Sequence, residues 1–394
     1  MIGNPLVNGN LGFFGRLKNS FFGVLIGLLF VPGAVALLSW NEYRTVHRSR
    51  GLAEASRVVQ TVPDIQHEAG SLNDTLVHLV GPAVSEPSGS KEPLRDPQFH
   101  VTSQGLRLQR QVEVYHWHEE SQQGQSGTSS NNQRRSVVQY EKKWTRKPVD
   151  SSKFEQPQQH LNPMPRYEEQ TFDAARVQVG VYELSETLKS AISNWTDVSL
   201  DSDTIILGMP DDRWEFFSGD QKQLYYSETG GSMSSPQIGD LRIRFQECLP
   251  TDVSMVAKLN GRRLQEFRTS NGESIERLFV GRLTAEDIMK RLASENSVLA
   301  WVIRIGGLIL CTIGFLLILG PVSALTSFIP IVGRLTGGLV LLAAILLAGI
   351  VGSTTIAIAW IAVRPILGIG LLFAAGVGVF LLIRLKPNSP VPTA

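Results

Sequence analysis

His116 and His118 are the two residues of this sequence whose type and spacing could do chemistry. They lie two positions apart on a predicted strand, so both imidazole rings should face the same way, as paired metal ligands must. Glu119 and Glu120 follow directly. A third imidazole would have to come from one of the more distant histidines, His78, His100 or His160. Their spacings match no metal signature, so a metal-binding or hydrolytic site competes with ordinary polar positions on a half-exposed sheet.

The rest of the sequence carries no recognised catalytic motif. It has no nucleophile elbow, zinc-protease motif, P-loop or dinucleotide fingerprint. Cys248 lacks a neighbouring histidine that could activate it, and Cys311 lies inside an apolar segment, so the two thiols form no disulfide framework. We therefore predict a non-enzymatic protein without a cofactor, and keep the site at His116 and His118 as the alternative.

The charges of the chain are unevenly distributed. The total of 37 Lys and Arg against 36 Asp and Glu is nearly neutral, but every acidic residue lies between Glu42 and Glu295. That interval holds 30 basic and 36 acidic residues, a net formal charge of −6. A domain that neutralises phosphates along a nucleic acid would be basic, so nucleic acid is excluded as the expected partner.

Four long apolar segments predict four transmembrane helices, at residues 21–40, 298–320, 335–363 and 366–383. A cleaved signal peptide is the alternative for the first, but its apolar core would be shorter, so we predict a retained anchor. Between the first two spans we expect a β-rich domain at 41–283 and, at 284–297, a helix that continues into the membrane. A short interfacial loop is predicted at 321–334, and polar ends at 1–20 and 384–394.

The positive charges near the spans predict the orientation. Those on the side of the two termini outnumber the one on the opposite side, Arg364; they are Arg16, Lys18, Arg334, Arg384 and Lys386. Arg44, Arg48 and Arg50 oppose this assignment. The short-loop count nevertheless predicts cytoplasmic termini and an extracytoplasmic β-rich domain.

Residues expected at the membrane interface follow from this topology. Three tryptophans fall at span ends on the domain side, where aromatic belts form. Arg304 is the one charge embedded in an apolar segment, and it should either snorkel to the interface or pair with Glu42 or a lipid headgroup. The predicted interface residues are Trp40, Glu42, Arg44, Trp301, Arg304, Trp360 and Arg364.

Small residues at four-residue spacing predict faces where helices approach closely. They occur in three of the predicted spans, and they could pack the bundle internally or join copies of the chain. The predicted packing residues are Gly23, Gly27, Ala344, Ala348, Gly352, Gly370, Ala374 and Gly378.

The middle of the chain alternates apolar and polar residues as half-buried strands do. Strands are predicted at 75–80, 106–118, 136–145, 177–181, 223–226, 241–245, 254–259 and 263–267. A loop is expected at 119–134, a polar tract without apolar residues, and an amphipathic helix at 184–192. Thr284 and Asp287 have the spacing of a capping box at a helix start. The pattern indicates a mostly-β sandwich or partly closed barrel with few helices.

Short stretches along nearly the whole chain resemble the transmembrane protein 43 (LUMA) family. They are Asn41-Glu42-x-Arg44, Leu52-Ala53-Glu54, Leu76-Val77-His78, Val112-Glu113-Val114-Tyr115 with Trp117, Asn162-Pro163, Val177-Gln178-Val179-Gly180, Gly239-Asp240-Leu241-Arg242, Asn296-Ser297 with Trp301 and Arg304, and Arg364-Pro365. The matches are scattered, which indicates a distant member, and we expect a bacterial one. Tyr43, Thr45 and the polar loop after Glu120 depart from the animal pattern.

The resemblance implies a four-span protein with a large lumenal or extracytoplasmic domain and no catalytic residues. Animal members resemble scaffolds of the endoplasmic reticulum and inner nuclear membrane that associate with other membrane proteins; a bacterial member would lie in the cytoplasmic membrane. We therefore expect an α+β membrane protein with one N-terminal and three C-terminal spans that acts as a scaffold. Its expected partners are the lipid bilayer, other membrane proteins and a second copy of itself. A channel or transporter is the remaining alternative, although no ionisable residue lies near the middle of a span.

Overall fold

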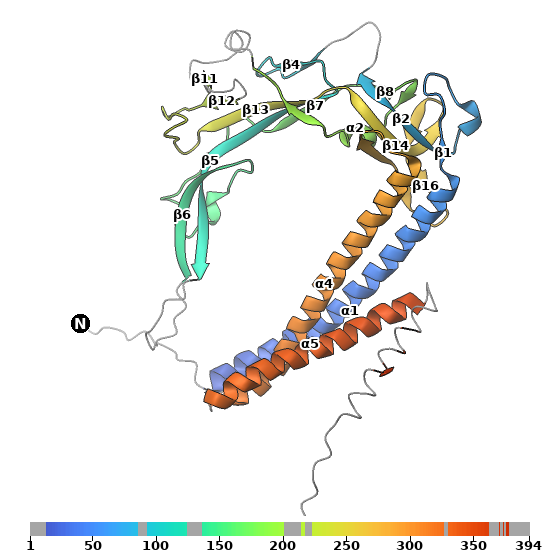
Figure 1. Cartoon of the computed structure of the whole chain (residues 1–394). Coiled ribbons are helices and arrows are strands. Elements are labelled where there is room, and N and C mark those ends of the chain that lie inside the picture. Colours follow the sequence, from blue (N-terminus) through green and yellow to red (C-terminus); the bar gives the residue numbers. More distant parts are fainter. Residues whose placement is uncertain are drawn as a thin grey trace, which may run out of the picture. The chain divides into compact units, whose positions relative to one another are not determined.

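The computed structural model describes residues 13–85, 93–123, 136–200, 214–216, 223–326 and 330–361, and positions 370, 373, 376 and 377 (Figure 1). The chain divides into two compact units. We call the first, Met1–Arg57 with Arg268–Ser274 and Met289–Ala394, the helical unit. The second, Val58–Phe267 with Ile275–Ile288, is the β unit.

Within the residues that the structure describes, three helices are long and apolar enough to cross a membrane. They are α1 (Phe13–Val58), α4 (Ala285–Thr326) and α5 (Pro330–Ile361), with candidate spans at Phe22–Val58, Ala285–Pro321 and Gly338–Trp360. One N-terminal span, a large β-rich segment and further C-terminal spans are thereby confirmed. The predicted fourth span at 366–383 lies almost entirely outside the described residues, as do Arg364 and the segments 1–12 and 384–394, so they remain predictions.

The helices extend beyond the predicted spans. α1 continues to Val58 because residues 41–58 are mostly helix-forming and contain no proline. α4 is uninterrupted from Ala285, so the predicted leading helix and the second span are one helix. Residues 321–326, expected in a loop, are its last turns, since a span tolerates the hydrogen bond lost at Pro321. α5 begins at Pro330, where the missing N–H costs nothing.

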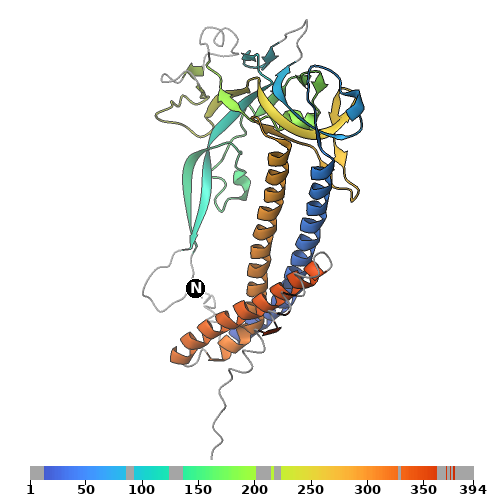
Figure 2. The same cartoon turned by 45° about the vertical axis from the view of Figure 1, so that its right-hand side comes forward.

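The helices α1, α4 and α5 cross one another (Figures 1 and 2), and small residues lie at their contacts. Ala344 and Ala348 of α5 are buried, and Ala348 packs with Ala34 and Cys311. A Cβ at Gly27 would lie 2.6 Å from the carbonyl oxygen of Gly314, so α1 and α4 approach too closely there for a larger residue.

The other predicted packing residues differ in surroundings. A Cβ at Gly352 would clash with Leu308 of α4, whereas one at Gly23 would make an ordinary 3.6 Å contact with Leu317. A Cβ at Gly370 would meet no described atom within 4 Å. Ala374 and Gly378 lie outside the described residues.

Replacing Gly27 with alanine should lower the thermal stability of the protein in detergent, although alanine is the better helix former. The gain in helix propensity is about 1 kcal/mol, whereas forcing an atom into a close helix contact costs about 1–3 kcal/mol. Gly33 is the matched control on the same helix, because its added Cβ would meet nothing within 4 Å. Gly33→Ala should therefore leave the melting temperature unchanged or raise it. Equal shifts for the two variants would contradict close packing at Gly27.

Five strands of the β unit pair in a closed ring. Around the ring they are β2 (Leu76–Ser85), β8 (Val177–Val179), β9 (Tyr182–Glu183), β15 (Arg263–Gln265) and β14 (Thr251–Asn260), which pairs again with β2. β1 (Gln60–Thr61) and β18 (Arg277–Val280) extend the same sheet. The core of the ring includes Leu79, Tyr182 and Met255, all fully buried. The ring is a small barrel, within the range of folds expected from the sequence.

A second sheet runs in the order β11 (Trp214–Phe216), β12 (Gln223–Tyr226), β13 (Leu241–Cys248), β5 (Arg107–Gln123) and β6 (Ser136–Thr145). β10 (Trp195–Asp197) pairs with β13, and β7 (Gln170–Asp173) pairs with β5. Its core contains Leu108, Val112 and Val114, the apolar face predicted from their alternation. β5 extends five residues beyond His118, into the stretch predicted as a loop, because those residues pair with β6.

The remaining elements in the described part of the chain are short. They are β3 (Leu94–Arg95), β4 (Thr102–Ser103), β16 (Phe267–Arg268), β17 (Ser274–Ile275), the α-helix α2 (Glu186–Ser190) and two 3₁₀ helices, Gly70–Leu72 and Ser151–Lys153. The capping box that precedes α4 is present: Asp287 N–H donates to Thr284 Oγ1 at 3.1 Å, and Thr284 Oγ1 donates to Asp287 Oδ2 at 2.7 Å.

Candidate functional site

The helical unit contains a buried ion pair between α1 and α4. Arg304 donates through Nε to Glu42 Oε1 at 2.6 Å and through Nη2 to Oε2 at 2.8 Å. Trp360 of α5 donates through Nε1 to Glu42 Oε2 at 2.7 Å. The guanidinium lies over the rings of Trp301 and Trp360, 5.0 and 5.7 Å from their centroids. Of the two partners considered for Arg304, the structure places Glu42 against it, so the charge in the span is neutralised within the protein.

Two asparagines join α1 and α4 next to this pair. Asn41 of α1 donates through Nδ2 to the carbonyl oxygen of Ala300 at 3.1 Å, and Asn296 of α4 donates to that of Thr45 at 3.0 Å. Asn41 thus bonds α4 at the residue four positions after Asn296, and Asn296 bonds α1 at the residue four positions after Asn41. The Oδ1 atoms of both asparagines and Thr45 Oγ1 are buried and have no hydrogen-bond partner among the described residues. Such unsatisfied acceptors are costly and call for an explanation.

A cavity of about 500 Å³ opens beside these groups. It is lined by residues of α1, α4 and α5, including Glu42, Thr45, Arg50, Asn296, Trp301 and Arg304. Arg50 is exposed, and it makes no ion pair with any residue that the structure describes. Because Glu42 and Arg304 neutralise each other, Arg50 leaves the lining with one net positive charge.

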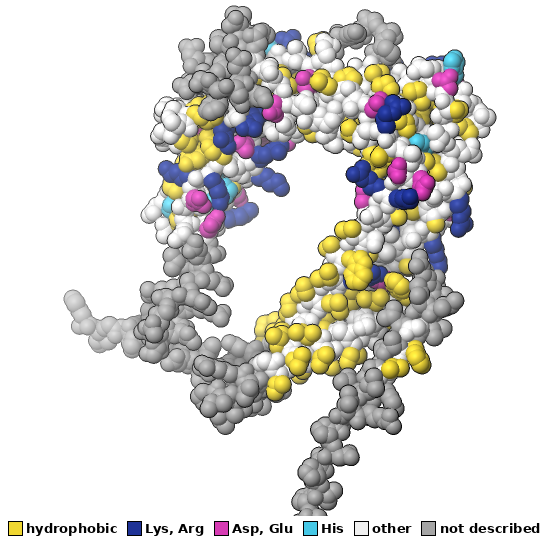
Figure 3. Space-filling view, in the orientation of Figure 1, with side chains coloured by type: hydrophobic (Ala, Val, Ile, Leu, Met, Phe, Trp, Pro, Cys, Tyr) yellow, Lys and Arg dark blue, Asp and Glu magenta, His cyan; other side chains and the backbone are white. Residues whose placement is uncertain are grey.

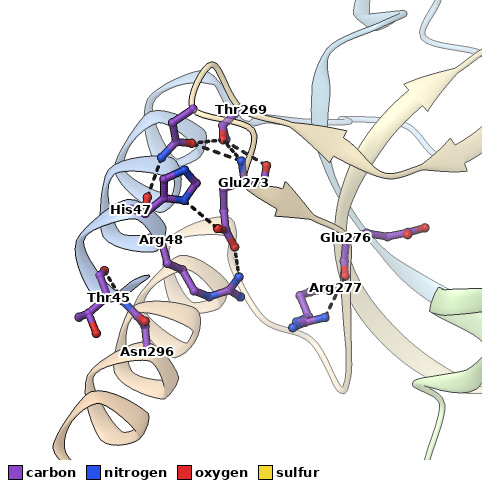
Figure 4. Close-up of polar contacts among 9 residues, drawn as sticks. Thr45, His47, Arg48, Thr269, Glu273, Glu276, Arg277 and Asn296 are labelled. Atoms are coloured by element: carbon purple, nitrogen blue, oxygen red, sulfur yellow. Dashed lines mark hydrogen bonds and ion pairs between the residues drawn. The ribbon is translucent and has the colours of Figure 1, made fainter. Parts of the chain in front are cut away.

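The segment 268–274 contacts α1 near the same stretch (Figure 4). The Glu273 carboxylate forms an ion pair with Arg48 and lies 3.5 Å from His47 Nδ1. Asn271 Nδ2 donates to the His47 carbonyl oxygen at 2.6 Å, and Ser270 N–H donates to Glu54 Oε1 at 2.8 Å. These contacts fasten the segment to α1, and within the described residues its histidine and carboxylates form no group of three that could hold a metal ion.

The other predicted interface residues lie close by. Trp40 is exposed, as expected of a residue facing lipid headgroups. Arg44 has Nε and Nη2 buried without a partner in the described part of the chain. Of the three predicted belt tryptophans, Trp301 and Trp360 meet at the Arg304 guanidinium.

The geometry at His116 and His118 does not resemble a metal site. His116 is buried; its Nδ1 accepts the Val149 N–H at 3.3 Å, which leaves Nε2 to donate to the Pro163 carbonyl oxygen at 3.0 Å. Neither ring nitrogen is free to bind a metal. His118 Nε2 is buried without a partner among the described atoms. No three His, Cys, Asp or Glu residues gather into a metal-binding group within the described ranges.

Burial lowers the pKa of His116 and of His78 below the ordinary value, and hydrogen bonds to backbone oxygens offset this only in part. Between these lowered values and about 6.5, the unfolded chain binds more protons than the folded one. The β unit should therefore lose stability as the pH falls through about 6.5, by at most roughly 1.4 kcal/mol per pH unit for each histidine. Thermal unfolding and hydrogen exchange of β2 and β5 peptides between pH 8 and pH 5 would measure this.

His116→Gln combined with His78→Gln should reduce that pH dependence to the share of His118, whose pKa burial also lowers, whereas His67→Gln, at a highly exposed position, should not change it. A double variant as pH-sensitive as the natural chain would disprove this explanation.

The thiol of Cys248 is unsuited to catalysis. Burial raises its pKa to about 11, and Sγ lies 3.7 Å from the Ile192 carbonyl oxygen, to which it donates. It is therefore protonated at neutral pH, and a protonated thiol is a poor nucleophile.

Sequence comparison agrees with this architecture. The profile of the Transmembrane protein 43 family matches residues 114–365. The Transmembrane protein 43 homolog of Drosophila melanogaster is 30% identical over 373 residues, which cover 90% of this chain and 91% of its own. Transmembrane protein 43 of Homo sapiens and of Mus musculus are each 26% identical over 371 residues, 90% of this chain and 88% of theirs. No solved structure matches. The profile spans most of the β unit and two of the membrane helices, and the relatives align over nine-tenths of the chain, so this chain belongs to the transmembrane protein 43 family.

Proposed function

We propose that this membrane protein is a non-enzymatic multi-pass scaffold that organises a membrane protein assembly or lipid patch through its β unit and its helices. The observation that carries the proposal is the outer edge of β6. Among the described strands, β6 pairs with β5 alone, over all ten of its residues. An unpaired edge of this length offers a row of backbone donors and acceptors to a strand from another chain.

The opposite edge of the same two strands is already covered. The backbone N–H and carbonyl oxygen of Trp117 bond the side chain of Asn162 at 2.8 and 2.9 Å, as a neighbouring strand would. Tyr115 N–H donates to the Asp240 carbonyl oxygen at 2.9 Å. The contrast between a covered edge on β5 and an unpaired edge on β6 favours β6 as the surface for a partner. No comparable observation favours the metal-binding, hydrolytic or transport alternatives.

Photo-crosslinking in native membranes would test the proposal. A crosslinking amino acid at Gln139 or Glu141, both exposed on β6, should give adducts with a defined membrane protein or a second copy of the chain. Glu186, exposed on α2, is the control position and should give none. The protein extracted with its native lipid should also have a mass larger than one chain. A monomer without adducts, or equal adducts from Glu186, would contradict the scaffold.

The location of the units is part of the same proposal. We infer cytoplasmic termini and an extracytoplasmic or lumenal β unit, in the bacterial cytoplasmic membrane or in the endoplasmic reticulum and inner nuclear membrane according to the source. The short-loop charges support this orientation. Labelling of a cysteine introduced at Lys153, an exposed residue of the β unit, with a membrane-impermeant reagent should succeed from outside the sealed compartment of a bacterium. Labelling only after lysis would reverse the assignment.

A further inference from the structure

We propose that the cavity between α1 and α4 binds a glycerophospholipid whose headgroup donates hydrogen bonds, with its phosphodiester at Arg50 and its donors toward Thr45 and Asn296. The site does not depend on the scaffold role, since a bound lipid would be found whether or not the chain assembles partners. About 500 Å³ is enough for a headgroup and its glycerol.

The net positive charge of the residues that line the cavity favours a phosphate group as the ligand. Both carboxylate oxygens of Glu42 accept hydrogen bonds from Arg304, and one also accepts from Trp360. The charges of Glu42 and Arg304 therefore neutralise each other, and neither attracts a charged ligand. Arg50 lines the same cavity, is exposed, and has no ion-pair partner among the described residues. A guanidinium binds a phosphate by parallel charged hydrogen bonds.

The unsatisfied acceptors select the kind of headgroup. Thr45 Oγ1 and Asn296 Oδ1 are buried without partners, and both residues line the cavity. Asn41 Oδ1 is likewise unsatisfied, one helical turn before Thr45 on the same face of α1. The two amide oxygens can only accept, so they need donors, which an ethanolamine ammonium or a glycerol hydroxyl supplies and a choline does not. The Thr45 hydroxyl can accept from the same donors or donate to the phosphodiester.

The surroundings of the cavity select a lipid over a soluble phosphate ester. Trp301 lines the cavity and is exposed, and Ile305 and Ile309 follow at four-residue spacing on α4, each more than half exposed. An acyl chain would lie along this stripe. In Figure 3 hydrophobic side chains gather over the lower stretch of the helices and charged ones over the stretch above, the arrangement that an amphiphile requires. The cavity extends about 12 Å along α1 from Glu42 to Arg50.

Competition between lipids would test the site in the full-length protein. The delipidated chain in mild detergent is given an equimolar mixture of phosphatidylethanolamine, phosphatidylglycerol and phosphatidylcholine, and bound lipid is identified by native mass spectrometry. We expect the first two to be retained over phosphatidylcholine by about tenfold, since a hydrogen bond lost at a buried group costs about that factor. Equal retention of phosphatidylcholine would overturn the assignment of donors.

Matched variants locate the binding. Arg50→Gln should weaken binding of both favoured lipids about tenfold, whereas Arg57→Gln, seven residues further along α1 and outside the lining, should not. Ser297→Trp fills the cavity from an exposed position of its lining and should abolish binding, while Ser294→Trp, exposed and outside the lining, should not. If the two variants of either pair weakened lipid binding equally, the assignment of this cavity as the lipid site would be wrong.

One further arm separates a lipid from a soluble ligand. Glycerophosphoethanolamine carries the same phosphodiester and ammonium without acyl chains. It should compete at least about a hundredfold more weakly than phosphatidylethanolamine, because it cannot bury apolar surface along Trp301 and Ile305. Competition at equal concentration would show that the cavity binds a soluble phosphate ester and would overturn the lipid.

Discussion

Replacing Glu42 with leucine is expected to lower the free energy of unfolding of the helical unit by about 3–5 kcal/mol, the usual cost of removing one partner of a buried ion pair. Arg304 would keep its charge at a site that is 9% exposed, and the Trp360 N–H would lose its acceptor. Arginine cannot relieve the penalty by losing its proton. Denaturant-induced and thermal unfolding of the full-length chain in lipid nanodiscs, followed by tryptophan fluorescence, would measure the loss.

The double variant Glu42→Leu with Arg304→Leu should recover much of that stability, because two apolar side chains of similar size leave no buried charge. Arg57→Leu, at an exposed position of the same helix, is the control for loss of one arginine. A double variant as unstable as Glu42→Leu would assign the loss to packing instead. An unchanged midpoint for Glu42→Leu would show that the ion pair contributes nothing to stability.

The sequence predicted the elements whose hydrophobic pattern is strong. The transmembrane spans were predicted from the length of the apolar segments. β12 was predicted with its observed bounds, Gln223–Tyr226, because its apolar side chains are contiguous, and the structure buries them. The alternation of Leu108, Val112 and Val114 likewise identified the buried face of β5. Hydrophobicity is a property of each residue type, so a local pattern of apolar residues suffices to predict which face is buried.

The sequence could not predict structure that depends on distant pairing. β5 continues through polar residues to Gln123 because β6 pairs with it. Neither an alternation of apolar and polar residues nor the β-propensity of these residues favours a strand there. Asn41 and Asn296 bond each other's helices across more than 250 residues, and the sequence singled them out only as parts of the stretches that resemble the family. Glu42 was one of two partners considered for Arg304, since sequence spacing cannot distinguish a carboxylate from a lipid.

A second buried ion pair, in the β unit, was not predicted at all. Arg110 of β5 donates through Nη1 to Asp96 Oδ2 at 2.7 Å, and through Nε to the Glu168 carbonyl oxygen at 3.0 Å. Asp96 is fully buried, and its Oδ1 accepts the N–H groups of Gln98 and Phe99 at 2.8 and 3.1 Å. The carboxylate thus fixes the turn between β3 and β4 and neutralises the arginine.

Asp96→Asn is expected to destabilise the β unit by about 3–5 kcal/mol, because it leaves the Arg110 guanidinium buried without its counter-charge. Hydrogen exchange of the peptide 94–101 in the full-length chain should accelerate, and the melting temperature should fall.

Asp150→Asn is the matched control for this substitution, because Asp150 also accepts a backbone N–H two residues on, from Ser152 at 3.1 Å, but is exposed and pairs with an exposed Lys153. Its replacement should change the melting temperature little, since an exposed ion pair is screened by water and salt. Each aspartate accepts a backbone N–H in its own turn. Equal shifts in melting temperature for the two variants would mean that this turn hydrogen bond, and not the buried charge, is what stabilises the protein at Asp96. A large shift for Asp96 alone assigns it to the buried charge, and Asp96→Leu with Arg110→Leu should then restore part of the loss.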